Sequence, residues 1–179
     1  MGLPMGSLMQ NAKIVPALAP ATMAGAADGD WVSMKAYDKV GILVYITQGN
    51  AATTAITVDS GTSVAGANLN AGITFHHWYI ADTAIGTDAG TNSDTWVDGG
   101  AVATVTTSAT GSGASLHYLE VNADTVISGQ SAFTAATQYD CIQLKLGASD
   151  VANIAAAAYV MFPSRYAQAV SPWPSAIID

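Results

Sequence analysis

The chain has 179 residues, a length that suits one domain. Charged residues make up only 10% of it, and thirteen acids against five basic residues give a formal net charge of −8. This balance excludes functions that depend on neutralising phosphates, so no nucleic acid is expected as a partner, and an anionic membrane surface would repel the chain. So few charges indicate that much of the surface is covered and make large protein–protein contacts a candidate, with a weakly charged, threonine-rich surface in water as the alternative.

Residues 1–30 are predicted to form an extended N-terminal arm. Three prolines deny this segment a continuous helix, yet it carries apolar side chains without a helical period. An apolar arm needs a surface to lie on, which is either its own domain or a neighbouring protein. We expect this arm to make protein contacts through Ile14, Val15, Leu18 and Met23.

The body is predicted to span residues 31–168 and to consist of strands. Alternating apolar and polar residues, β-branched and aromatic side chains, and Gly or Asp turns mark about eight of them. They are residues 31–36, 39–48, 53–58, 73–81, 101–108, 115–122, 139–146 and 152–162. The second and third are predicted to pair as a hairpin. The last contains an alanine run typical of a helix, but its alternation and its Tyr-Val-Met-Phe ending favour a strand.

Two further segments carry tryptophans as candidate contacts. Residues 82–100 are predicted to be a polar loop around Trp96. Residues 169–179 are predicted to be an extended C-terminal tail in which prolines flank a tryptophan. Such a tryptophan is either tucked against its own body or an anchor on a partner. We expect the tail to bind protein through Trp173, Ile177 and Ile178.

These elements predict an all-β protein, an antiparallel β-sandwich with extended arms at both ends. The sequence leaves open whether the sandwich is a jelly roll or immunoglobulin-like. Cys141 lies in a strand-like run and is predicted to be buried, and a single cysteine excludes an internal disulfide. Trp78 is also predicted to be a core residue.

No motif predicts catalysis, and we expect no enzyme, no cofactor and no metal. The chain lacks the GxSxG, GxGxxG, P-loop and HExxH patterns. His76 and His77 are neighbours on a predicted strand, so they point to opposite faces and cannot easily share a metal ion. His117 lies on another strand and could pair with one of them. The aspartates of residues 82–100 are interpreted as solvated loop residues.

Three stretches resemble a group of small virion proteins from tailed bacteriophages. They are KIVPALAPATMAGAADGDWVSMKAYDKVGILVYI (residues 13–46), TTAITVDSGTSVAGA (53–67) and AAAYVMFPSRYAQAVSPWPSAIID (156–179). Together they cover somewhat less than half of the chain. The resemblance implies a capsid decoration, or cement, protein, which has no catalytic residues. Such a protein lies on the outer capsid surface of the virion, where it binds and stabilises the shell of major capsid protein.

Self-association as a homotrimer is expected, because three copies on a threefold capsid site engage the shell together. Two alternative functions remain open from the sequence. One is another virion part, such as a phage tail or tail-tip structural protein, which its location on the particle would reveal. The other is a carbohydrate-binding or adhesin β-sandwich, which coplanar exposed aromatic rings on one face would favour.

Overall fold

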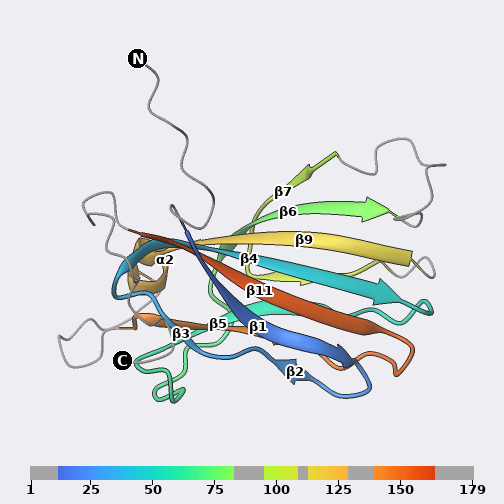
Figure 1. The fold of residues 1–179 in the computed structure, drawn as a ribbon, viewed down its shortest axis with the longest axis horizontal. Helices are drawn as coiled ribbons and strands as arrows, with labels where there is room; N and C mark the ends of the chain where they lie inside the picture. The colour runs from blue at the N-terminus through green and yellow to red at the C-terminus, as the bar shows by residue number, and fades with distance from the viewer. Residues whose placement is uncertain (1–11, 83–94, 109–112, 129–138, 164–179) are drawn as a thin grey trace.

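In a computed structural model, residues 12–82, 95–108, 113–128 and 139–163 are described, and they form two antiparallel sheets packed as a sandwich (Figure 1). The predicted all-β sandwich is therefore confirmed. The larger sheet has six strands in the order β1-β11-β4-β9-β6-β7, and the smaller has five, with β10 between β5 on one side and β2 and β3 on the other.

The strands of the larger sheet are β1 (Lys13–Thr22), β4 (Tyr37–Gln48), β6 (Phe75–Asp82), β7 (Val97–Val102), β9 (Gly113–Asn122) and β11 (Ile154–Pro163). Those of the smaller sheet are β2 (Ala27–Asp28), β3 (Val32–Ser33), β5 (Ala55–Gly61), β8 (Thr104–Thr106) and β10 (Cys141–Leu146). A short helix, α2 (Ala123–Ser128), follows β9. Within the described part of the chain, no helix has the length and apolar character needed to cross a membrane.

The strand order decides between the two topologies that the sequence left open. β6 and β7 form a hairpin that extends the larger sheet. Apart from this hairpin, the chain alternates between the two sheets. It passes from β1 in the larger sheet to β2 and β3 in the smaller sheet, and then returns to β4 in the larger sheet. It next forms β5 and β8 in the smaller sheet, β9 in the larger, β10 in the smaller and finally β11 in the larger. This repeated crossing between two sheets is the jelly-roll arrangement.

The predicted hairpin of residues 39–48 with residues 53–58 is wrong. β4 pairs with β11 along one edge and with β9 along the other. β5 lies in the other sheet, between β10 and β8. Because both edges of β4 are occupied by strands of similar length, the chain has to leave the larger sheet after the turn.

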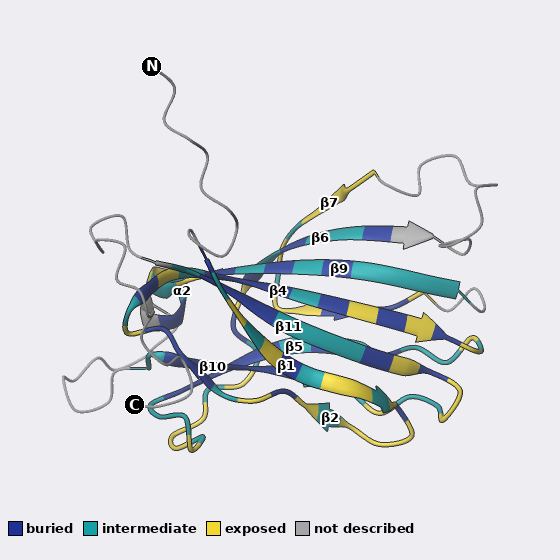
Figure 2. Ribbon diagram, viewed as in Figure 1, coloured by how far each residue is buried: buried dark blue, intermediate teal, exposed yellow. Residues whose placement is uncertain are grey.

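The core fills the space between the sheets, and its side chains come from alternate positions of each strand. From the larger sheet, fully buried residues include Val40, Ile42, Val44, Ile46, Leu119, Val121, Tyr159 and Met161. From the smaller sheet they include Ile56, Val58, Ile142 and Leu144. Cys141, the neighbour of Ile142, is also fully buried, so the predicted burial of the cysteine is confirmed. Figure 2 shows the corresponding dark blue bands along β4 and β10. Each such aliphatic side chain contributes roughly 1.5–3 kcal/mol by its burial.

The described part of the predicted N-terminal arm belongs to the sandwich. Lys13–Thr22 forms the edge strand β1, which pairs with β11. Met23 is fully buried, and Val15 and Leu18 pack against the core. Of the two surfaces that the sequence allowed, this segment therefore lies on its own domain. Residues 1–11 lie outside the described residues.

Candidate functional site

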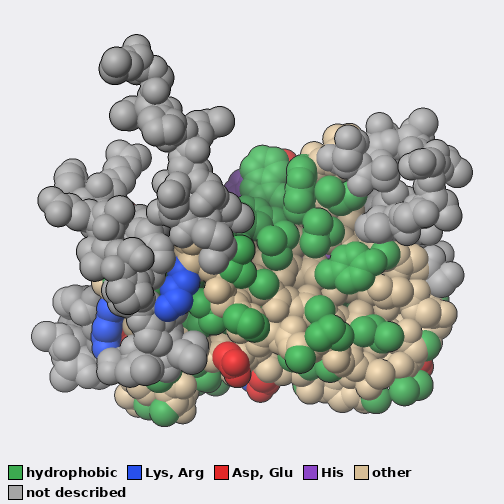
Figure 3. Space-filling model, viewed as in Figure 1, with side chains coloured by type: hydrophobic (Ala, Val, Ile, Leu, Met, Phe, Trp, Pro, Cys, Tyr) green, Lys and Arg blue, Asp and Glu red, His purple; other side chains and the backbone are tan. Residues whose placement is uncertain are grey.

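The larger sheet turns a second apolar face away from the core. Successive side chains of a strand point to opposite faces, so the residues between the core positions form an outer face. The term "outer face" is used below for Ile14, Leu43, Tyr45, Trp78, Ile80, Leu116, Tyr118, Ala156, Ala158 and Val160. None of these residues joins the hydrophobic core cluster between the sheets. Figure 3 looks onto this face and shows hydrophobic side chains gathered over its middle.

The pairing register sets these side chains in continuous rows across the strands. One row consists of Ala158, Leu43, Tyr118 and Trp78, and the next of Ala156, Tyr45, Leu116 and Ile80. Side chains directly opposite each other on paired antiparallel strands have their Cβ atoms about 4.5–5.5 Å apart. The apolar residues therefore form one continuous surface across four strands.

This face departs from the usual pattern of an antiparallel sheet in water. Where one face packs on a core and the other is solvated, apolar and polar residues alternate along each strand. Residues 40–46 of β4 instead read VGILVYI, which is apolar on both faces. Tyr45, at 41% exposure, meets solvent in the isolated chain, and so does Ile154 of β11, at 46%. A sheet face of this composition is typical of a surface that another protein covers.

Two tryptophans lie at this face. The prediction that Trp78 is a core residue is wrong, because His77 takes the core-facing position of β6 and leaves Trp78 half-buried on the opposite side. Its ring lies 5.0 Å from that of His76, between centroids. Trp96 is 41% exposed and meets the ring of Tyr118 edge-on, with centroids 6.3 Å apart and planes at 73°.

The ring of Tyr118, on β9, lies against Gly41 of β4, which has no side chain. A Cβ atom placed on Gly41 would lie 2.3 Å from the ring of Tyr118, so only glycine admits this close approach. Burial raises the pKa of Tyr118, and the nearby Glu120 raises it further. The hydroxyl therefore stays neutral around pH 7, and the ring adds apolar area to the outer face.

The charged side chains at the margins of the outer face are paired within the chain. Lys39 Nζ lies 2.8 Å from Glu120 Oε1, and His76 Nε2 lies 2.7 Å from Asp98 Oδ1. The Gly100 N–H donates to Asp98, and this bond, with the contact to His76, holds the pKa of Asp98 below its usual value. Among the side chains that the structure describes, the face thus presents paired charges at its rim and apolar groups at its centre.

On the core side of the same strands, two histidines face each other. His77 Nε2 lies 3.0 Å from His117 Nδ1, and Ser115 Oγ lies 2.9 Å from His117 Nε2. His117 thus pairs with one of the two neighbouring histidines, as the sequence allowed. Burial, and then the charge of His77, lower the pKa of His117 to about 4. In the described residues, no group of three or more His, Cys, Asp or Glu side chains is arranged to hold a metal ion.

We expect acid to destabilise the sandwich through His117. In the unfolded chain this imidazole titrates near pH 6.5, whereas in the folded protein its pKa is about 4. Between these two values the unfolded chain binds more protons, so the free energy of unfolding falls as the pH falls. The expected contribution of His117 is a loss on the order of 2–3 kcal/mol between pH 7 and pH 4. Urea unfolding at a series of pH values measures it.

Two glutamine variants isolate this contribution. His117→Gln keeps a hydrogen-bonding side chain but removes the buried imidazole, so its stability should fall less on acidification. His76→Gln removes an imidazole that is 39% exposed, and it should keep the acid-induced loss of the wild type. Equal pH dependence in the wild type and in His117→Gln would contradict the assignment.

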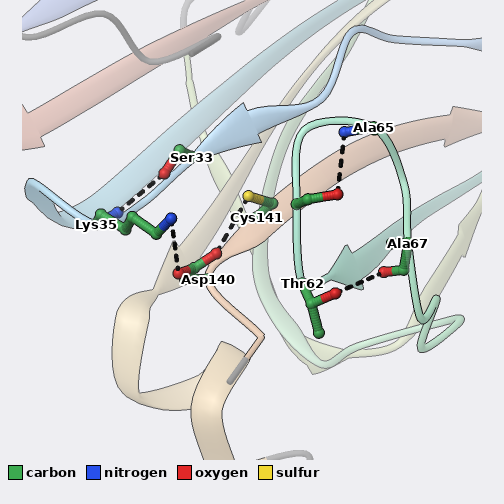
Figure 4. Close-up of polar contacts among 8 residues, drawn as sticks. Ser33, Lys35, Thr62, Ala65, Ala67, Asp140 and Cys141 are labelled. Atoms are coloured by element: carbon green, nitrogen blue, oxygen red, sulfur yellow. Dashed lines mark hydrogen bonds and ion pairs between the residues drawn. The ribbon is translucent and has the colours of Figure 1, made fainter. Parts of the chain in front are cut away.

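A hollow of about 320 Å³ at one end of the sandwich is lined by polar and apolar residues that include Lys35 and Asp140. Figure 4 shows Lys35 Nζ beside Asp140, at 3.7 Å, and the thiol of Cys141 donating to Asp140 Oδ1, at 3.2 Å. In the same view, Thr62 Oγ1 donates to the Ala67 carbonyl and closes the turn that follows β5. These contacts hold the strand ends together, and Cys141 acts as a core residue.

The structure brings only some of the predicted contact residues to one place. Ile14 lies on the outer face and Trp96 at its margin. Val15, Leu18 and Met23 face the core instead. The three predicted contacts of the tail lie outside the described residues, and their role stays a prediction: Trp173, Ile177 and Ile178.

No family model and no curated protein matches the chain. Among solved structures, it is similar to the SPBc2 prophage-derived protein YomS, with a TM-score of 0.44 and 8% identity over 84% of this chain and 93% of that one. It also aligns with the infectious bursal disease virus Gt strain (TM-score 0.20) and with the VP2 subviral particle of that virus (TM-score 0.17). Both of these alignments have 10% identity and cover 86% of this chain and 41% of the other. At these TM-scores the likenesses assign neither a family nor a function.

Proposed function

We propose that this chain is a non-catalytic structural protein of a tailed-bacteriophage virion and that it decorates the outer surface of the major capsid protein shell. The observation that carries the proposal is the apolar outer face of the larger sheet, where Ile14 and Tyr45 are exposed and most of the other side chains are partly exposed, while Ile80 and Val160 are buried. Such a face suits packing against protein, because its centre offers large apolar contacts and its rim offers paired charges. The resemblance of residues 13–46, 53–67 and 156–179 to phage virion proteins indicates the kind of assembly.

The physical demands on a cement protein agree with this surface. A decoration protein gains affinity by burying apolar area across subunit contacts, at about 2.5 kcal/mol for each 100 Å² removed from water. Only part of that gain appears as affinity, because association also costs translational and rotational freedom. The jelly roll occurs in viral capsid domains and in lectins alike, so the fold by itself does not decide the function.

In this proposal the sandwich is the rigid body, and the terminal segments reach the major capsid protein. Trp173, Ile177 and Ile178 are the proposed anchors of the tail. Self-association adds avidity, because several linked copies bind the shell together. The proposal involves no nucleic acid, membrane or cofactor.

One aromatic contact disfavours the carbohydrate-binding alternative. A flat sugar-binding platform needs exposed rings in one plane, whereas the rings of Trp96 and Tyr118 meet at 73°. A phage tail or tail-tip structural role needs the same kind of protein-binding face and remains the alternative. The location of the protein on the particle separates the two.

Co-sedimentation of the purified full chain with capsid shells that lack it tests the proposal. We expect the chain to bind the shells in a fixed stoichiometry and to raise the temperature at which they open. A β-sandwich protein of similar size and net charge is the control for nonspecific binding. Binding to isolated tails but not to shells would contradict the decoration function and favour the tail alternative.

A further inference from the structure

The charge distribution of the chain limits which protein surfaces can pack against the outer face. The chain carries a net charge of −8, and Asp30 and Asp124 are exposed acids that are not among the residues of the outer face. Two copies that met through acidic surfaces would bring like charges together, which is unfavourable. On the outer face, Glu120 and Asp98 are already paired with Lys39 and with His76. This face is therefore one where two copies can meet without bringing unpaired carboxylates of the described residues into direct contact.

The lack of unpaired charge on the outer face also argues against a different protein that would recognise this face through complementary charges. Interfaces with a different protein commonly use complementary charges for specificity and for rapid association. Among the residues that the structure describes, the side chains at the centre of the outer face are aliphatic or aromatic and uncharged, so they present no charge pattern for a different protein to complement. A second copy, with the same apolar centre, matches it.

The shape of the outer face also suits packing against the same face of a second copy of the chain. Leu43 and Tyr45 of β4 form a ridge of large side chains, while their direct partners on β11 are Ala158 and Ala156. Ridge and trough thus lie on adjacent strands, about 4.8 Å apart. When two such faces meet about a twofold axis, the ridge of each copy can enter the trough of the other, as an isologous interface requires.

We infer that the outer face binds the outer face of a second copy of this chain, forming a twofold dimer by sheet-on-sheet packing. The inference deepens the proposed function, since it names the partner of the surface on which that proposal rests. It differs from the trimer predicted from the sequence, in which the contact between copies would join unlike surfaces. Stacked sheets of this kind lie about 10 Å apart, a distance that the alanine trough permits.

Sedimentation velocity of the purified full chain, up to about 100 µM, tests the inference. We expect a species of twice the 18.2 kDa of one chain. Tyr45→Glu places a carboxylate from each copy in the interface, and it should raise the dissociation constant by about 30-fold or more. The matched control is Leu69→Glu, which adds the same charge at a leucine that is 52% exposed and lies outside the outer face. The control should leave the dissociation constant unchanged.

A second variant guards against a folding defect in Tyr45→Glu. Ala158→Tyr fills the trough from the outer side without adding charge, and it should also dissociate the dimer while the unfolding temperature stays near that of the wild type. Raising the salt from about 0.02 to 0.3 M should tighten the dimer, because the ions screen the repulsion between the two acidic chains. Weaker association at high salt would contradict the inference that the interface is uncharged.

A wild-type chain that stays monomeric, or a trimer that both outer-face variants leave intact, would overturn the inference. Neither result would touch the decoration function, which co-sedimentation with shells tests separately. Conversely, a dimer that the variants dissociate but that binds no shells would support this inference and contradict the proposed function.

Discussion

Replacing Tyr159 with phenylalanine is expected to lower the free energy of unfolding by about 2–4 kcal/mol. Tyr159 is fully buried on β11, in the larger sheet. Its hydroxyl accepts a hydrogen bond from the Leu144 N–H of β10, at 2.9 Å, and donates one to the Asp30 carbonyl, at 2.8 Å. One oxygen therefore ties the two sheets together. Phenylalanine would leave both backbone groups without this partner, and a buried unsatisfied polar group costs about 1–3 kcal/mol.

Urea unfolding of Tyr159→Phe beside Tyr45→Phe measures this effect. Burial raises the pKa of Tyr159, so its hydroxyl stays protonated and remains a donor throughout the usual pH range. Tyr45 lies on the outer face and is 41% exposed, so loss of its hydroxyl should change stability by less than about 0.5 kcal/mol. Similar small losses in both variants would show that the link between the sheets contributes little.

Met23→Ala is expected to cost about 2–5 kcal/mol of folding stability, the usual range for removing a fully buried large side chain. Met23 follows β1, and its backbone is held on both sides: its N–H donates to the Asn153 carbonyl, and its own carbonyl accepts from the Ser149 N–H, each at 2.8 Å. The side chain therefore belongs to the core and is not free to bind a partner. Thermal or urea unfolding of the purified variant measures the loss.

Ile14→Ala is the matched control, because Ile14 is exposed on the outer face of the same segment. It should cost less than about 1 kcal/mol in the isolated chain. Equal losses in Met23→Ala and Ile14→Ala would contradict the core assignment.

The same reasoning limits truncation experiments. Removing residues 1–11 leaves β1 intact, whereas removing residues 1–27 takes away an edge strand and a core side chain together.

Local patterns predicted most of the strands, because periodicity and turn residues act within a few positions. Residues 39–48 match β4, and residues 152–162 match β11. In β11 the residues alternate as a strand requires, but Ala156 and Ala158 of the alternating set that indicated the strand face outwards, and Tyr159 and Met161 between and beyond them face the core. Tertiary packing there overrides the helix preference of alanine.

Pairing and crossing between sheets could not be predicted in the same way. Residues 101–108 read as one alternating strand, yet β7 ends at Val102 in the larger sheet and β8 begins at Thr104 in the smaller one. The alternation of side chains continues through such a crossing, so the sequence carries no local sign of it. The false hairpin of β4 with β5 has the same cause.

The sequence also carries a signal of the outer face, in the doubly apolar run of residues 40–46. A strand that is apolar on both faces is normally covered on both. To turn that run into a surface, however, one has to know that β11 and β9 flank β4 and bring alanines on one side and Leu116 and Tyr118 on the other. That neighbourhood follows from the topology and not from spacing along the chain.

A cryo-EM reconstruction of the native particle that carries this protein, with side-chain density, tests the central claim most directly. The account predicts copies at regular positions on the outer capsid surface, with their terminal segments on major capsid protein and their outer faces covered by protein. Copies found only along the tail or at its tip, or outer faces left bare to solvent, would contradict it.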